Sequence, residues 1–149
     1  MAKRILVPLD QSALAAAVIP LVADTARGSH ATVRLLHVAP QPENRVNDEG
    51  RVVAYADQEM ERLSAQGLDY LATVEAQLDG VPVERSVRFG EPVNEILREA
   101  EAAEADLIAV ATGKRSGIAR ELLGSVAEQV LRRADVPVML IRPGRPHPA

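Results

Sequence analysis

The stretch ATGKRSGIARELLGS, residues 111–125, contains the residue types that could hold a phosphate group. Glycines let a ligand approach the backbone, and basic side chains attract anions. A P-loop reads G-x-x-x-x-G-K-[ST], and fitting it to Gly113-Lys114 would require a glycine at position 108 and a hydroxyl at position 115. The chain has Ile108 and Arg115 there. The segment is therefore not a P-loop, and its chemistry depends on the elements around it.

The end of this stretch supports two interpretations. Ser125 followed by Glu128 forms a capping-box pattern, in which the hydroxyl accepts from a backbone N–H and the glutamate reaches back to the cap. The same helix start would offer free N–H groups and a positive dipole to a phosphate, with Gly124 leaving space for the ligand. Capping and phosphate binding use different donors, so both interpretations stay open.

The rest of the sequence contains no recognisable catalytic motif. The sequence has neither G-x-S-x-G nor H-E-x-x-H, and its three histidines lie far apart. His37 lies inside an apolar run, which favours a hydrogen-bonded structural role. Asp10 follows the first apolar run and is equally suited to ligand contact and to solvent exposure. We expect no enzyme activity and no bound metal.

The amino-acid composition limits the size of the domain, the classes of partner molecule and the location that we expect. The 149 residues are 47% hydrophobic, enough for the core of one domain, which we expect over residues 1–143 with a flexible tail at 144–149. The net charge of -4 with dispersed bases argues against nucleic acid, and the absence of cysteine excludes disulfides. Pro8 and Asp10 interrupt the apolar N-terminus, and no run is long enough to span a membrane, so we expect a soluble, cytoplasmic protein.

The elements that must position these residues alternate along the chain. Apolar runs at 4–9, 31–38, 81–89, 106–111 and 136–143 predict five strands. Segments 12–27, 51–78, 92–104 and 125–133 predict helices, and 40–50 predicts a polar loop. The second helix would bear an apolar stripe that includes Val53, with Gly67 on that face as a kink or a point of close approach.

Strict alternation of strands and helices predicts an α/β fold. We expect a doubly wound five-stranded parallel sheet, in the order 3-2-1-4-5, with helices on both faces. Ligands of such sheets bind at the carboxyl ends of the strands. The loops there lack the hydroxyl-rich loop and the aromatics of a flavodoxin, and strand three does not end in the phosphorylatable aspartate of a response-regulator receiver.

The chain resembles the universal stress protein family over nearly its whole length. ILVPLDQS resembles the opening strand and loop of the family, LLHV its second strand, and FGEPVNEIL its turn into the third helix. ADLIAVAT and LLGSVAEQVLRRADVPVMLIRP resemble its C-terminal half. The resemblance implies a non-catalytic stress-response module, often a homodimer, whose nucleotide-binding members hold ATP with a G-x-x-G-x9-G-[ST] loop.

Aligning Gly124-Ser125 with the end of that loop puts Ala111 and Lys114 where the family has glycines, with Gly113 one position away. We therefore expect ATP or AMP, with Mg for ATP, to bind more weakly than in members with all three glycines. The resemblance places the nucleotide on these residues: Pro8, Asp10, Val38, Ala111, Gly113, Lys114, Gly124, Ser125 and Val126.

Two alternatives remain at this point. A nucleotide-free member would act as a dimeric scaffold for protein contacts, and a slow ATP hydrolase is the least favoured because no base is visible. The edge strand VPVMLI, residues 136–141, is too apolar to remain bare, which predicts a homodimer paired through it.

Overall fold

A single parallel sheet organises the chain. The computed structural model describes residues 3–12, 17–43, 45–46, 48–50, 52–112 and 118–142. Its main sheet has five strands, every neighbouring pair is parallel, and the order β5-β2-β1-β6-β7 is the predicted order 3-2-1-4-5. The strands are β1 (Arg4–Pro8), β2 (Thr32–Ala39), β5 (Val83–Phe89), β6 (Leu107–Ala111) and β7 (Val138–Ile141).

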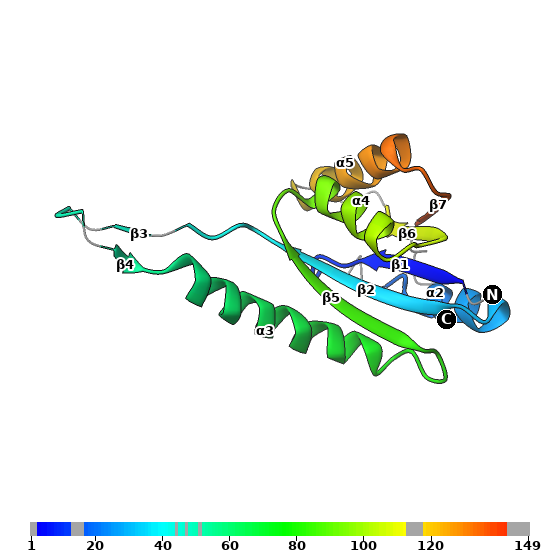
Figure 1. Cartoon of the computed structure of the whole chain (residues 1–149). Coiled ribbons are helices and arrows are strands. Elements are labelled where there is room, and N and C mark those ends of the chain that lie inside the picture. The colour runs from blue at the N-terminus through cyan, green and yellow to red at the C-terminus, as the bar shows by residue number, and fades with distance from the viewer. Residues whose placement is uncertain are drawn as a thin grey trace, which may run out of the picture.

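Helices cover both faces of this sheet (Figure 1). Helices α2 (Ile19–Ser29) and α3 (Ala56–Glu75) bury one apolar cluster against one face. Helices α4 (Pro92–Ala102) and α5 (Ile118–Arg133) bury a second cluster against the other. Successive strand residues point to opposite faces, so Ile5 and Val7 belong to the first cluster and Leu6 to the second. The doubly wound α/β fold is confirmed.

The turn from β5 into α4 explains the GEP motif. Gly90 has φ +139°, a backbone conformation that residues with a side chain rarely adopt. A Cβ there would also lie 3.2 Å from the Glu95 side chain, so glycine avoids both the strain and the close contact. Glu91 caps the helix, because its carboxylate accepts from the backbone N–H groups of Val93 at 3.1 Å and Asn94 at 2.8 Å. Proline suits the first helical position that follows the cap.

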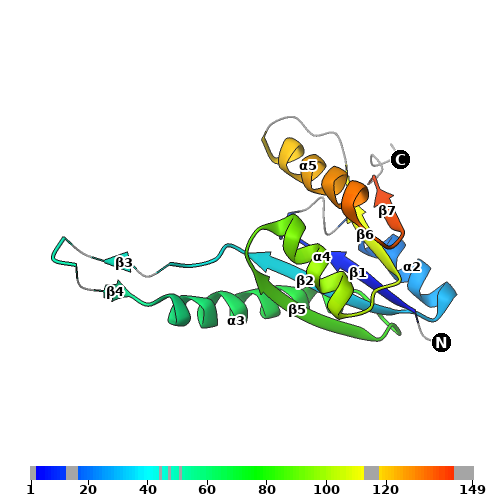
Figure 2. The ribbon, with the colours of Figure 1, turned by 45° about the horizontal axis from the view of Figure 1, so that its top comes forward.

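A long arm extends from the sheet between β2 and the body of α3 (Figure 2). It contains a two-stranded antiparallel hairpin, β3 (Arg45–Val46) with β4 (Val52–Ala54). The predictions of a plain loop at 40–50 and a helix from 51 were wrong here: α3 begins at Ala56, and Val53 lies in β4. The consecutive β-branched residues Val52 and Val53 favour a strand over a helix. The sequence prediction missed this preference because Val53 also fits the apolar stripe of a helix.

Two other helix starts differ from prediction. Helix α2 begins at Ile19 rather than residue 12, with Pro20 in its first turn, and residues 13–16 lie outside the described residues. Helix α5 begins at Ile118, seven residues before Ser125. The segment ARELL is rich in helix formers, and this propensity carries the helix through the glycine at 124.

Candidate functional site

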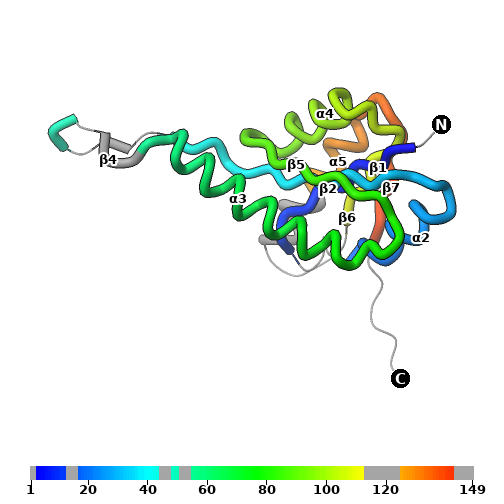
Figure 3. The backbone as a smooth tube through the Cα atoms, turned by 60° about the horizontal axis from the view of Figure 1, so that its bottom comes forward, coloured from blue at the N-terminus to red at the C-terminus, as the bar shows by residue number. Residues whose placement is uncertain are grey.

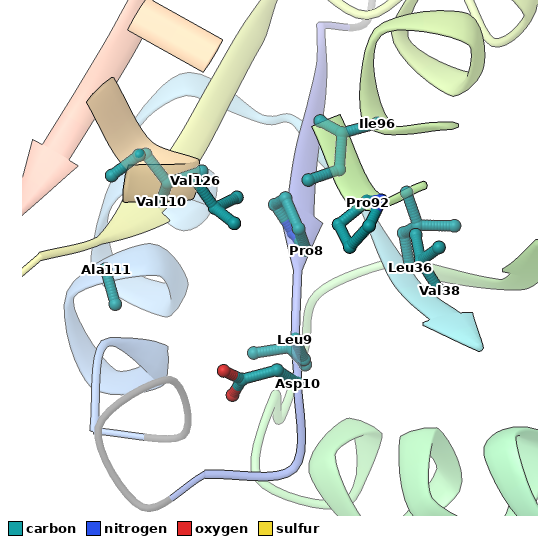
Figure 4. Close-up of a pocket in the computed structure, with 11 residues that line it drawn as sticks. Pro8, Leu9, Asp10, Leu36, Val38, Pro92, Ile96, Val110, Ala111 and Val126 are labelled. Carbon is teal, nitrogen blue, oxygen red and sulfur yellow. The ribbon is translucent and has the colours of Figure 1, made fainter. Parts of the chain in front are cut away.

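A cavity of about 260 Å³ opens where the strand order reverses, between β1 and β6. This switch point at the carboxyl ends of the strands is where open α/β sheets bind ligands. Figure 4 shows the cavity walls converging from β1, β2, β6, α4 and α5. The lining residues are Pro8, Leu9, Asp10, Leu36, Val38, Pro92, Ile96, Val110, Ala111, Val126 and Ala127.

The described lining residues are apolar except for one carboxylate. Asp10 follows β1, and its side chain points into the space beside Ala111 of β6 (Figure 4). Val38 of β2 and Val126 of α5 also line the cavity. Five residues that the sequence suggested for a nucleotide site therefore line one cavity: Pro8, Asp10, Val38, Ala111 and Val126.

The turn that carries Asp10 is closely tied to its neighbours. The backbone N–H of Leu9 donates to the carbonyl of Leu36 at 2.8 Å, which continues the β1–β2 ladder past the end of β1. One Asp10 carboxylate oxygen accepts from the N–H of Ser12 at 2.9 Å. Gln11 between them has φ +69°, a left-handed conformation that costs a non-glycine residue about 1–2 kcal/mol.

The remaining predicted residues lie elsewhere. Gly113 and Lys114 fall outside the described residues. Gly124 and Ser125 lie within α5, so the prediction that Ser125 caps a helix start together with Glu128 was wrong, as was the expectation of free N–H groups there. The exposed Ser125 hydroxyl instead accepts from the side chain of Gln129 at 3.1 Å.

Sequence reasoning missed about half of the cavity wall. The periodicity of the strands contained the signal: Leu36 precedes Val38 by two residues and therefore faces the same way. Pro92 and Ile96 share one face of α4 by the four-residue spacing of a helix. The missed residues are Leu9, Leu36, Pro92, Ile96, Val110 and Ala127.

A second polar constellation, which the sequence did not predict, lies between α4 and the sheet. We call it the charged seam: Arg34, Glu84, Arg88, Glu95 and Glu99. Glu99 is only 3% exposed, and its two carboxylate oxygens accept from Arg34 Nε and Arg88 Nε, each at 2.8 Å. Arg34 also donates to Glu84 at 2.9 Å, and Arg88 to Glu95 at 3.3 Å.

The seam lowers the pKa of two of its carboxylates, Glu99 and Glu84. Burial alone would raise the pKa of Glu99, but hydrogen bonds from Ser86, Arg88 and Arg34 outweigh it and place the pKa below its ordinary value. The pKa of Glu84 is lowered in the same way, because hydrogen bonds from Arg4 and Arg34 overcome burial. Each of the three seam carboxylates is paired with an arginine. We therefore interpret the seam as a structural feature that holds α4 against the sheet.

The described residues contain neither a cluster of metal ligands nor a membrane-spanning helix. Nowhere among them do three histidine, cysteine, aspartate or glutamate side chains gather as metal ligands would. None of their helices combines the length and apolarity needed to cross a bilayer.

Comparison with known proteins gives the family. The model of the universal stress protein family matches residues 1–142. The universal stress protein YxiE of Bacillus subtilis is 28% identical over 148 residues, covering 95% of this chain and 100% of YxiE. The universal stress protein MJ0531 of Methanocaldococcus jannaschii is 38% identical over 84 residues, covering 55% of this chain but only 49% of MJ0531. That match therefore spans about half the length of the relative.

Solved structures show the same architecture. The hypothetical protein MJ0577 superposes with a TM-score of 0.77 at 25% identity, covering 98% of this chain and 99% of that one. A universal stress protein from Archaeoglobus fulgidus, solved in complex with dAMP, has a TM-score of 0.62 at 23% identity, covering 95% and 98%, and this likeness shows the fold. With the family model matching almost the whole length, the chain belongs to the universal stress protein family.

Proposed function

We propose that this protein is a cytoplasmic, non-catalytic stress-response module, a single domain over residues 1–143, that binds an adenine nucleotide weakly. The observation that carries the proposal is the cavity at the switch point, whose apolar walls surround one carboxylate, Asp10. Among the described residues, no side chain that lines this cavity is a base poised beside a nucleophile, which favours binding over hydrolysis.

The cavity suits a purine better than a whole nucleotide. Its volume of about 260 Å³ lies below the roughly 300–1,000 Å³ of typical ligand pockets, so a base and part of its sugar fill it while phosphates stay outside. Val38 and Val126 offer apolar surface to a flat ring. The carboxylate of Asp10 can accept from an exocyclic amine, which adenine has. The dAMP complex of the Archaeoglobus protein supports this ligand class, because that fold holds an adenine nucleotide.

Phosphate contacts form the finer part of the proposal. Gly113 and Lys114 come after Thr112, the residue that follows β6 in the sequence. With Gly124 and the exposed hydroxyl of Ser125 on α5, they remain our proposed phosphate contacts, with Mg for ATP. A lysine in place of a glycine loses backbone freedom worth about 1–2 kcal/mol in a left-handed conformation, but its charge can return a similar amount. Binding should therefore survive, weaker than with glycines at 111 and 114.

Melting curves test the nucleotide. We expect millimolar Mg-ATP or AMP to raise the melting temperature, since ligand at 100 times its dissociation constant stabilises by about 2.7 kcal/mol. The shift should shrink in Asp10→Ala and in Gly124→Val and grow in Lys114→Gly. No shift, no calorimetric binding and no co-purified nucleotide would overturn the proposal and leave the nucleotide-free scaffold.

A second proposal concerns assembly, since the scaffold alternative depends on it. Strand β7 pairs only with β6, so it forms one edge of the five-stranded sheet, and Leu140 on it is 41% exposed. We propose that two copies pair through residues 136–141 about a two-fold axis. Pro137 has no N–H to donate, so pairing centres on Val138–Leu140. Light scattering should give a dimer mass that Met139→Glu reduces to that of a monomer; a wild-type monomer at micromolar concentration would contradict the pairing.

A further inference from the structure

The imidazole of His37 holds the peptide that leads into the cavity. His37 Nδ1 lies 3.1 Å from the carbonyl oxygen of Leu9, the residue directly before Asp10. A carbonyl only accepts, so the hydrogen sits on Nδ1 and the imidazole donates. His37 belongs to β2 on the face packed by α3, the opposite face from Val38, so it contacts the turn from behind without lining the cavity.

Helix α3 fixes the imidazole from two directions. The ring of Tyr70 meets that of His37 edge-on, with centroids 6.2 Å apart and planes at 67°. Gly67, one turn earlier, brings the helix backbone close: a Cβ there would lie 3.1 Å from His37 Cδ2 and 2.9 Å from Val87 Cγ2. Gly67 is thus the predicted point of close approach, and its lack of a side chain makes space for His37.

Tyr70 also lies close to the turn itself. Its hydroxyl is buried and has no partner of good geometry among the described residues. Burial and then the charge of Asp10 raise the pKa of Tyr70, while a contact with the Gln11 backbone lowers it. The Tyr70 hydroxyl therefore lies near the turn at Asp10 and Gln11, so α3 packs against both His37 and this turn.

Such support is what the turn requires. Left-handed Gln11 is strained, and strained backbone persists only where its surroundings over-determine it. We propose that His37, packed between Tyr70 and Gly67, is a positioning residue that sets the turn carrying Asp10 into the cavity and so tunes nucleotide affinity. The affinity part of this inference rests on the proposed function, whereas the positioning part does not.

Two amide substitutions at His37 distinguish the effect of the Nδ1 hydrogen-bond donor from the effect of the imidazole ring. The side-chain nitrogen of asparagine occupies nearly the place of His37 Nδ1, whereas that of glutamine lies nearer Nε2. His37→Asn should therefore bind Mg-ATP within about twofold of the wild type, and His37→Gln about tenfold more weakly, a difference of 1.4 kcal/mol. The matched control is His30→Asn, which removes an exposed histidine at the end of α2. Equal losses in the Asn and Gln variants would overturn the proposal.

A measurement without ligand tests the positioning role of His37 separately from the proposed nucleotide binding. Amide hydrogen exchange of Ser12 reports the turn, because its N–H donates to Asp10. His37→Gln should speed this exchange about tenfold while the amides of β6 keep wild-type rates. Unchanged Ser12 exchange overturns the positioning role even if nucleotide binds. Fast exchange in a protein that binds no nucleotide supports the positioning role and overturns only the proposed function.

A double-mutant cycle supplies the last test. In an Asp10→Ala background, His37→Gln should change Mg-ATP affinity less than about twofold, because the side chain that it positions is gone. Two losses that simply add would mean that His37 acts on the ligand independently of Asp10, contrary to the proposal.

Discussion

The cavity and the charged seam occupy the same layer between the sheet and α4, yet they have opposite character. Along one face of β2, Arg34 belongs to the seam and Leu36 and Val38 to the cavity. On α4, Glu99 belongs to the seam and Ile96 to the cavity. Every seam carboxylate has an arginine partner, whereas Asp10 forms no ion pair among the described residues. Paired charges hold the layer together, whereas Asp10 is the carboxylate that we propose contacts the ligand.

The comparison predicts that breaking the seam costs stability and spares binding. Glu99→Ala leaves Arg34 and Arg88 without their buried partner, which should lower the free energy of unfolding by about 3 kcal/mol. Urea unfolding measures this loss, and calorimetry below the transition should give wild-type affinity for Mg-ATP. A large affinity loss in the folded variant would mean that the two regions are not separate.

Filling the cavity should have the reverse effect. Val126→Phe places a larger apolar side chain in the cavity and should weaken Mg-ATP binding at least tenfold, about 1.4 kcal/mol, with little change in stability. The matched control is Leu131→Phe on the same helix, where the side chain is 49% exposed and lines no part of this cavity. Equal binding by both variants would place the ligand elsewhere.

Acid should weaken the charged seam and with it the stability of the fold. Burial tends to raise the pKa of Glu99 and Glu84, but hydrogen bonds from the arginines lower both below the ordinary 4.5. The folded state then binds fewer protons than the unfolded state, so stability is present above pH 4.5 and falls as the pH drops through the lowered values. Urea unfolding from pH 6 to pH 3 measures the slope, and Glu99→Gln should flatten it; an unchanged slope would assign the acid sensitivity to other carboxylates.

The smallest effect is expected where an ion pair is exposed. Arg85 and Glu75 join β5 to α3 at 3.1 Å, but both side chains are about two-fifths exposed. Arg85→Ala should therefore cost less than about 1 kcal/mol in urea unfolding. A loss as large as that of Glu99→Ala would mean that burial does not distinguish the two pairs.

The sequence predicted the sheet because nearly continuous apolar runs identify strands that are covered on both faces. The family resemblance also pointed to part of the cavity lining, since Pro8, Asp10 and Ala111 are among the lining residues. It did not predict Ile96 and Ala127 in the lining, because they come from helix faces whose placement depends on packing.

The seam and the last helix eluded prediction for a different reason. Pairing of Glu99 with Arg34 joins residues 65 positions apart, which no local pattern reveals. The capping pattern at Ser125 was locally plausible, but helix propensity in the preceding residues carried α5 through it. His37 was correctly expected to be a hydrogen-bonded structural histidine, although the acceptor, the Leu9 carbonyl, required the fold.

The arm that carries β3 and β4 gives the molecule an elongated outline (Figures 1–3). A compact domain of 149 residues would have a radius of gyration of about 15 Å. An elongated particle experiences more friction than a sphere of equal mass, tumbles more slowly and elutes earlier from a gel-filtration column. A monomer of this chain would therefore elute like a larger compact protein, so a dimer must be identified by absolute mass and not by elution volume.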